Sequence, residues 1–130
     1  MDTPRRPDDF DWVAARRACA IEAVFEVLAA QARRNVEAMR GAAAASLSVI
    51  DTGTTFTVLA GASRKARFRL VGGVVEVDVF GLARSVQLRA TVGLNDDGDC
   101  RLRVEGHLLQ PWQLLRRVLE PLFFPADAEA

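Results

Sequence analysis

The sequence predicts an α+β fold, a two-layer sandwich in which a six-stranded antiparallel meander sheet is covered on one face by a long N-terminal helix and a short C-terminal helix. Three observations lead to this prediction. Apolar residues recur every three or four positions near both ends of the chain, as on one face of a helix. Between Ser46 and Val104 they recur at every second position, as in strands that bury one face. Five glycine-containing turns divide this middle region into six strands.

The composition is that of an ordinary globular protein. Half of the 130 residues are hydrophobic and 26% are charged, so a chain of this length can bury a core without a metal ion. The 17 basic and 17 acidic residues cancel, which gives no argument for nucleic acid or an anionic membrane as a partner. We expect a mobile N-terminal tail at 1–9, a single α+β domain at 10–124 and a frayed C-terminus at 125–130.

The cysteines and the amino terminus bear on the compartment. Cys19 and Cys100 are far apart in the sequence and outside any CxxC spacing, which favours two buried, reduced thiols over a disulfide. No signal-peptide pattern follows the first residues, and no apolar stretch approaches the roughly 18 residues of a membrane-spanning helix. The preference for arginine over lysine and the abundant alanine suggest a GC-rich bacterial gene. The expectation is a cytoplasmic bacterial protein.

The first predicted element is one helix over residues 12–40. Carboxylates at positions 8, 9 and 11 can cap its free N–H groups, which favours a start between Phe10 and Trp12. Gly41 is a suitable stop. Its apolar face is formed by Ala14, Ala18, Ile21, Phe25, Leu28, Ala32, Val36 and Met39. At 1.5 Å per residue the helix would be about 43 Å long, whereas a six-stranded sheet is only about 24 Å wide.

The glycine pair Gly72-Gly73 defines the central hairpin and its register. Two glycines suit a two-residue turn in which both residues have positive φ. With this turn Arg69 faces Glu76 and Phe68 faces Val77, so apolar residues meet on one face and opposite charges on the other. A slip of one residue would destroy both agreements.

The strands before this hairpin are placed by the same reasoning. A hairpin around Thr52-Gly53 is predicted to place Val49 opposite Phe56. The following loop is predicted to place Val58 opposite Phe68, which keeps apolar residues on one face.

The strands after the central hairpin complete the meander. Val77 is predicted to face Leu88, and a turn at 96–98 brings Leu94 opposite Cys100. The last strand is expected to run on to His107. The predicted register also places five side chains in one row across the outer face of the sheet: Thr57, Arg69, Glu76, Arg89 and Glu105. The four charged members of this row alternate in sign.

The C-terminal helix begins at Pro111, because proline suits the first helical turn. Its predicted apolar face consists of Trp112, Leu115, Val118, Leu119 and Leu122. Pro121 is expected to end or kink the helix near 117–120. The apolar residues at 122–124 would then fold back on the core.

The sequence contains no recognised catalytic, metal-binding or phosphate-binding motif. His107 is the only histidine, and we expect a structural role for it. Glu76, Asp78 and Glu105 on the open face lie beside arginines that neutralise them, which favours a charged ladder over a metal site. We predict no catalytic residue, no cofactor and no metal ion.

The leading functional hypothesis is a non-enzymatic protein-binding or self-associating module, with another protein or a second copy as partner. The second half of the long helix should overhang the sheet and present an apolar strip with a charged border. The candidate contact residues are Val36, Met39, Arg33 and Arg40. Nucleic acid is disfavoured and no membrane is expected as a partner. Two alternatives stay open: a carrier of a small apolar ligand between helix and sheet, and an enzyme that uses arginine and carboxylate side chains.

Overall fold

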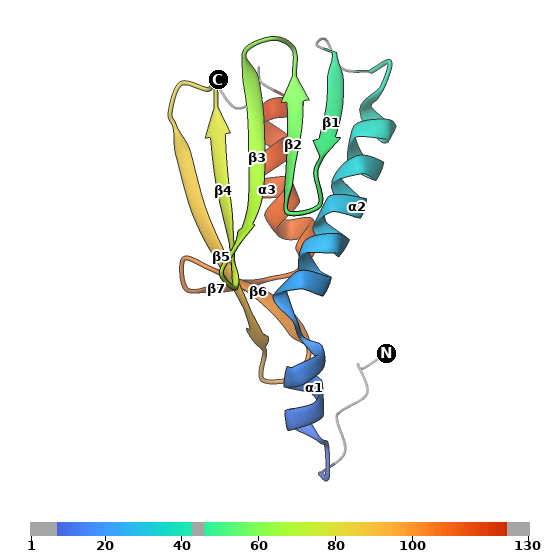
Figure 1. Ribbon diagram of the computed structural model, residues 1–130, viewed down its shortest axis with the longest axis vertical. Helices are drawn as coiled ribbons and strands as arrows, with labels where there is room; N and C mark the ends of the chain where they lie inside the picture. Colours follow the sequence, from blue (N-terminus) through green and yellow to red (C-terminus); the bar gives the residue numbers. More distant parts are fainter. Residues whose placement is uncertain (1–7, 43–45, 125–130) are drawn as a thin grey trace.

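The computed structural model describes residues 8–42 and 46–124 and confirms the α+β class. The predicted tail at 1–9 lies largely outside these residues, and the predicted frayed end at 125–130 lies wholly outside them. An open antiparallel sheet forms one layer, and helices α2 and α3 pack on one of its faces (Figure 1). In chain order the elements are α1 (Trp12–Ala18), α2 (Ile21–Met39), β1 (Leu47–Asp51), β2 (Thr55–Ala60), β3 (Arg64–Val71), β4 (Val74–Phe80), β5 (Val86–Leu94), β6 (Cys100–Val104), β7 (His107–Leu109) and α3 (Pro111–Phe123).

The sheet is a meander of seven strands, in the order β1-β2-β3-β4-β5-β6-β7, which is one strand more than predicted. Glu105 and Gly106 both have positive φ, 50° and 81°. They form a two-residue turn that sends β7 back along β6. Val104 therefore pairs with His107, and the prediction that His107 continues the preceding strand is wrong.

The register of the central strands is confirmed. Arg69 pairs with Glu76 across the Gly72-Gly73 turn. Further along the sheet, Leu94 pairs with Cys100. The other predicted pairs of this region, Phe68 with Val77 and Val77 with Leu88, are also present.

The first hairpin is shifted by two residues from the predicted register. Val49 pairs with Val58 instead of Phe56. The next pair of strands is shifted by two residues as well, because Phe68 pairs with Phe56 instead of the predicted Val58. Asp51 pairs with Phe56, and the Thr52 N–H donates to the Thr55 carbonyl at 2.8 Å. The shift in the first hairpin arises because the turn is therefore centred on Gly53 and Thr54, one residue further along the chain than predicted. A shift of two residues keeps every side chain on its predicted face of the sheet.

The predicted N-terminal helix is in fact two helices. The first begins at Trp12 as expected, and the Asp11 carboxylate accepts a hydrogen bond from the Ala14 N–H at 3.0 Å. The helix then breaks at Cys19 and Ala20, where Ala20 has extended φ and ψ values of −94° and 138°. None of the residues 12–18 of α1 is buried. Helix α1 lies beyond one end of the sheet, beside the turn between β5 and β6 (Figure 1).

The core lies between α2, α3 and the inner face of the sheet. Phe56 stacks on Phe68 with ring centroids 4.4 Å apart, and Phe25 of α2 packs on Phe56 at 5.2 Å. Phe56 and Phe68 are both 0% exposed. The predicted apolar face of the first helix is confirmed for α2, whose buried residues are Ile21, Phe25, Leu28, Ala29, Ala32 and Val36.

The C-terminal helix runs further than predicted, through Pro121 to Phe123. Proline lacks the N–H that would bond to the carbonyl four residues earlier. The apolar face nevertheless continues across it, and burial of that face maintains the last turn. The buried residues of α3 are Leu114, Leu115, Val118, Leu119 and Leu122. Trp112, which was predicted for this face, is 51% exposed. Within 8–42 and 46–124, no helix has the length and apolar character needed to cross a membrane.

Candidate functional site

A row of four exposed side chains runs along the outer face of α3. Trp112 and Phe124 are 51% and 46% exposed, and the side chains of Arg116 and Glu120 are 67% and 51% exposed. Residues four apart lie above one another on a helix. Phe124 follows the last helical residue, but its N–H still donates to the Glu120 carbonyl at 2.8 Å. We call these four residues the α3 row.

The α3 row is a wall shared by two surface grooves. The first, of about 340 Å³, lies between the row and the C-terminal end of α2, and we call it the α2–α3 groove. Apart from the row and Asn35, its lining is apolar: Ala38, Met39, Leu115, Leu119 and Phe123. The second, of about 570 Å³, lies between the row and β7, and we call it the β7 groove. It is more polar, and its further lining residues are His107, Leu109, Gln113, Arg117 and Pro121.

Opposite charges lie at the centre of the α3 row. Arg116 Nε lies 2.8 Å from Glu120 Oε2, and the hydrogen bond to this carboxylate raises the pKa of Arg116. On the side of the β7 groove, Arg117 forms a longer ion pair with Glu105 at 3.7 Å. The row therefore presents an aromatic ring at each end and one charge of each sign between them.

The structure separates the four contact residues predicted from the sequence. Val36 is 2% exposed and belongs to the core, so the overhang predicted for this half of the helix does not occur. Met39 packs against the core and also lines the α2–α3 groove. Arg33 forms an ion pair with Asp51, and Arg40 forms one at 2.8 Å with a carboxylate one turn earlier. Of the four residues, the structure places Met39 in the candidate site.

The ion pair of Arg33 ties α2 to the turn after β1. Asp51 Oδ1 accepts a hydrogen bond from the Gly53 N–H at 2.8 Å, and Asp51 Oδ2 accepts one from Arg33. These contacts, with the Gly53 N–H first, lower the pKa of Asp51. The arrangement stabilises an ionised carboxylate at the surface, which is a structural role.

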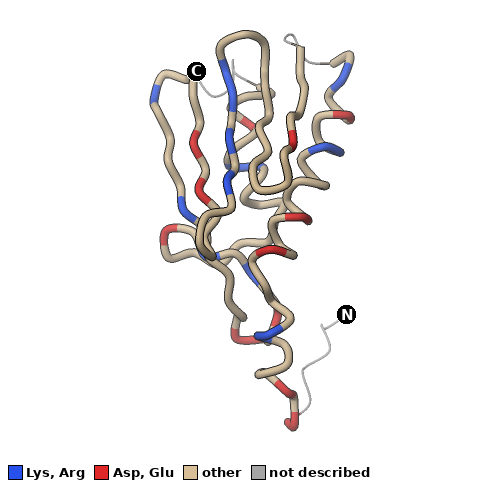
Figure 2. The backbone as a smooth tube through the Cα atoms, viewed as in Figure 1, with Lys and Arg blue, Asp and Glu red and all other residues tan. Residues whose placement is uncertain are grey.

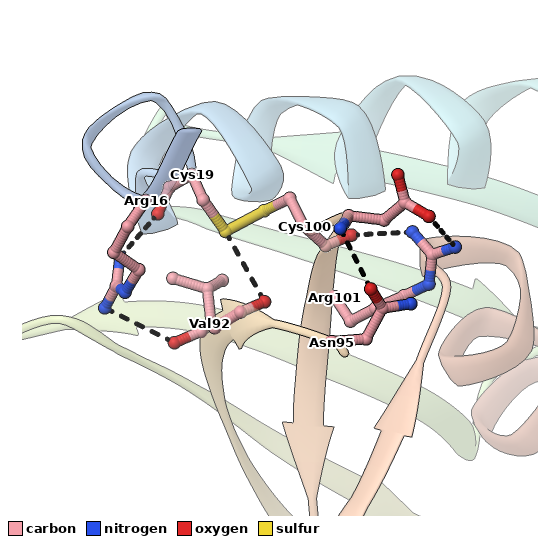
Figure 3. The surroundings of a disulfide bond; sticks show 8 residues. Arg16, Cys19, Val92, Asn95, Cys100 and Arg101 are labelled. Carbon is pink, nitrogen blue, oxygen red and sulfur yellow. Dashed lines mark hydrogen bonds and ion pairs between the residues drawn. A yellow bond between two sulfur atoms is a disulfide. The ribbon is translucent and has the colours of Figure 1, made fainter. Parts of the chain in front are cut away.

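Cys19 and Cys100 form a disulfide, so the prediction of two reduced thiols is wrong (Figure 3). Their Cα atoms are 5.4 Å apart although the residues are 81 positions apart in the sequence. The break between α1 and α2 brings Cys19 against the first residue of β6. Arg16 donates to the Cys19 carbonyl at 3.0 Å, and Arg101 donates to the Cys100 carbonyl at 2.9 Å. The disulfide thus fixes the helix break to the start of β6.

The open face of the sheet carries the middle of the predicted ladder of opposite charges, but the prediction is wrong at both ends of the row. Thr57 pairs with Arg67 and not with Arg69, and Glu105 lies in the turn after β6, where its ion pair is with Arg117 of α3. Basic residues follow β3, and acidic residues follow β4 beside it (Figure 2). Arg69 lies 2.9 Å from Glu76, and Arg67 lies 3.5 Å from Asp78. Because both carboxylates of β4 have an arginine partner, this face presents balanced pairs and not free acidic groups.

Phe80 of β4 and His107 of β7 lie on strands that are not neighbours in the sheet. The Phe80 ring lies under two cations, with Lys65 Nζ at 5.2 Å and Arg67 Cζ at 5.3 Å from its centroid, a cation–π arrangement that occupies its outward face. His107 is exposed and lines the β7 groove. Across the described ranges, no three His, Cys, Asp or Glu side chains lie close enough together to hold a metal ion.

Comparisons of the chain with protein-family models, with curated proteins and with solved structures found no match. The candidate site is therefore identified from the geometry of its residues. Sequence reasoning missed the α3 row because it assigned Trp112 to the buried face and Phe124 to a tail folded back on the core. The signal that could have revealed the row is its regular spacing, since Trp112, Arg116, Glu120 and Phe124 follow one another at intervals of four residues. Residues at this spacing are neighbours on one side of a helix.

Proposed function

We propose that this chain is a non-enzymatic protein-binding module whose contact surface is the α2–α3 groove with the α3 row. The supporting observation is that exposed Trp112 and Phe124 lie at either end of a largely apolar groove. Aromatic residues, methionine and arginine are enriched at protein interfaces, and tryptophan is among the residues that contribute most to binding. Met39, a contact residue expected from the sequence, lines the same groove.

The form of the groove favours a helix as the bound element. From Trp112 to Phe124 the row spans about 18 Å at 1.5 Å per residue. An amphipathic helix binds such a groove through residues on one apolar face. Arg116 and Glu120 on the wall would pair with charges of both signs on the partner. We expect a partner helix with large apolar side chains next to both acidic and basic residues.

The two alternative functions have less support. A carrier of a small apolar ligand needs space between α2 and the sheet, whereas Leu28, Phe56 and Phe68 pack there with 0% exposure. An enzyme based on arginine and carboxylate groups needs carboxylates in an unusual environment, whereas Glu76 and Asp78 are each paired with an arginine.

The cytoplasmic and bacterial setting expected from the sequence stays a prediction. The Cys19–Cys100 disulfide argues for a different compartment, because disulfides persist in the bacterial periplasm and at the cell exterior and are rare in the cytosol. We therefore include an oxidising compartment in the proposal.

Site-specific photo-crosslinking in an extract of the source cells tests the proposed surface. A benzoylphenylalanine residue at position 112 or 39 should give an adduct of one defined mass, because both positions line the groove. The same probe at Val71, which is 48% exposed on the sheet, should not give it. Ala38→Arg would fill the groove and should abolish the adduct, whereas Ala23→Arg, an equal change at another exposed alanine of α2, should not.

The outcomes discriminate clearly. An adduct that depends on the groove and survives Ala23→Arg supports the proposal. Adducts of equal yield from Val71, or an adduct that persists in the Ala38→Arg variant, would show that the α2–α3 groove is not the contact surface.

A further inference from the structure

We infer that the helix bound in the α2–α3 groove is α3 of a second copy of this chain, an inference that rests on the proposed function. The α3 row reads aromatic, positive, negative, aromatic, and this order is complementary to itself when it is reversed. If two rows lie side by side in opposite directions, Trp112 of one copy faces Phe124 of the other, and Arg116 faces Glu120. A twofold axis through the middle of the row produces all four contacts at once.

The geometry of helix packing allows this arrangement. Residues four apart form a ridge inclined by about 26° to the helix axis, and two such ridges pack side by side at a crossing angle of about 50°. Under the twofold axis, each row lies in the α2–α3 groove of the other copy. All four residues of the row line that groove, so the ridge and the groove have the same length. Met39 and Phe123, which also line it, would contact the incoming aromatic rings.

The charges favour a second copy over a partner that is merely apolar. Within one copy Arg116 and Glu120 are already 2.8 Å apart. A second copy adds two intermolecular pairs and closes a cluster of four charges that is neutral overall. Exposed pairs of this kind set orientation more than affinity, so the aromatic ends supply most of the binding.

A dimer of this kind needs to bury only a small part of the surface of each copy. A stable interface of standard size buries about 800 Å² on each partner, which is roughly a tenth of the 8354 Å² surface of this chain. The α3 row and the end of α2 line the same groove, so the row and the groove would be buried together in the dimer.

Sedimentation equilibrium of the purified, oxidised chain tests the inference through charge exchange. The wild type should sediment at twice the 14.2 kDa of one chain and dissociate on dilution. Arg116→Glu places four carboxylates at the twofold axis and Glu120→Arg places four guanidinium groups there, so each variant alone should associate at least about 100-fold more weakly. An equimolar mixture of the two variants should form a heterodimer, because every contact across the axis then joins opposite charges.

The control is Arg17→Glu, the same charge change at an exposed position of α1, which should leave the dimer intact. Both positions of the charge exchange are exposed, and circular dichroism checks that the variants fold. A wild type that stays at 14.2 kDa up to about 1 mM, or variants that fail to associate when mixed, would overturn the inference. A monomeric wild type together with a groove-dependent adduct of foreign mass at Trp112 would overturn this inference alone. A monomeric wild type that gives no groove-dependent adduct would remove the proposed function as well.

Discussion

Replacing both cysteines by alanine should lower the free energy of unfolding by about 4.5 kcal/mol. Cys19 and Cys100 close a loop over a sequence separation of 81. In the chain-entropy treatment a crosslink lowers the entropy of the unfolded chain by about 2.1 + 1.5R ln n cal/mol/K, where n is the number of residues in the closed loop. For this loop the entropy loss is about 15 cal/mol/K, which corresponds to about 4.5 kcal/mol at 25 °C. A single domain is usually stable by only about 5–15 kcal/mol. Loss of the disulfide should therefore remove a large share of the total.

Guanidinium denaturation with and without a reducing agent measures this loss. Reduced wild type should unfold with the same free energy as the Cys19→Ala, Cys100→Ala variant, and the reducing agent should not affect the variant. Cys19→Ala alone should lose as much as the double variant, because it breaks the same crosslink. The dependence of the free energy on denaturant should also become steeper, since the unfolded chain exposes more surface. A loss below about 1 kcal/mol would refute the explanation through loop closure, for which about 4.5 kcal/mol is expected.

Three further predictions concern the sheet and its turns. Phe68→Ala should cost about 3–5 kcal/mol, because this ring is 0% exposed and stacked in the core; a loss below about 1 kcal/mol in urea denaturation would contradict its central position. Gly72→Ala should cost about 1–2 kcal/mol for its positive φ alone, since a Cβ there meets nothing within 4 Å. Gly81→Ala should cost about 1–3 kcal/mol more, because a Cβ would lie 2.1 Å from the Ser63 carbonyl oxygen, and equal melting temperatures of the two variants would contradict this. Folding lowers the pKa of Asp51 from its ordinary value of 3.8. The ionised carboxylate therefore stabilises the fold fully above pH 3.8, and this stabilisation is lost as the pH falls through the lowered pKa of the folded state. Asp51→Asn should therefore be less stable than wild type by under about 1 kcal/mol at pH 7, with the difference vanishing in acid; a constant difference across the range would exclude the carboxylate as its source.

The central part of the fold was predictable because local chemistry determines it. Gly72-Gly73 restricts the turn, and complementary pairs such as Arg69 with Glu76 are satisfied by one register only. The same reasoning carries through to β6, where Leu94 pairs with Cys100. Prediction of the register was less reliable in the first hairpin. A shift of two residues leaves the same side chains buried and exposed, so the apolar pattern does not distinguish the two registers.

The parts that could not be predicted depend on contacts that are distant in the sequence or on residues without a distinctive signal. Apolar spacing continues through Ala18 and Ile21 as if one helix ran through both, and nothing in that spacing reveals the disulfide that Cys19 makes with β6. Glu105 adopts a positive φ of 50°, which side chains other than glycine rarely do, so the turn before β7 had no clear marker. These two positions account for the extra helix break and the extra strand.

The candidate site was predicted only in part for a related reason. Periodicity identifies that a helix has an apolar face, but large aromatic residues satisfy the same pattern whether they are buried or exposed. Trp112 was therefore assigned to the core, which Leu114 occupies instead. Met39 was predicted as a contact residue because the second half of its helix was expected to overhang the sheet. The overhang does not occur, and Met39 instead lines the α2–α3 groove.

The meander order of the strands also has a consequence for biosynthesis. Each strand pairs with its neighbour in sequence, so the hairpins can form one after another as the chain emerges from the ribosome. Cys19 is synthesised before its partner, which follows 81 residues later, a delay of about 4–16 s at typical elongation rates of about 5–20 residues per second. During that interval residues 1–99 offer the Cys19 thiol no second cysteine with which to pair. The native disulfide can therefore form only after β6 has been synthesised, and until then the Cys19 thiol is open to disulfide exchange with other molecules.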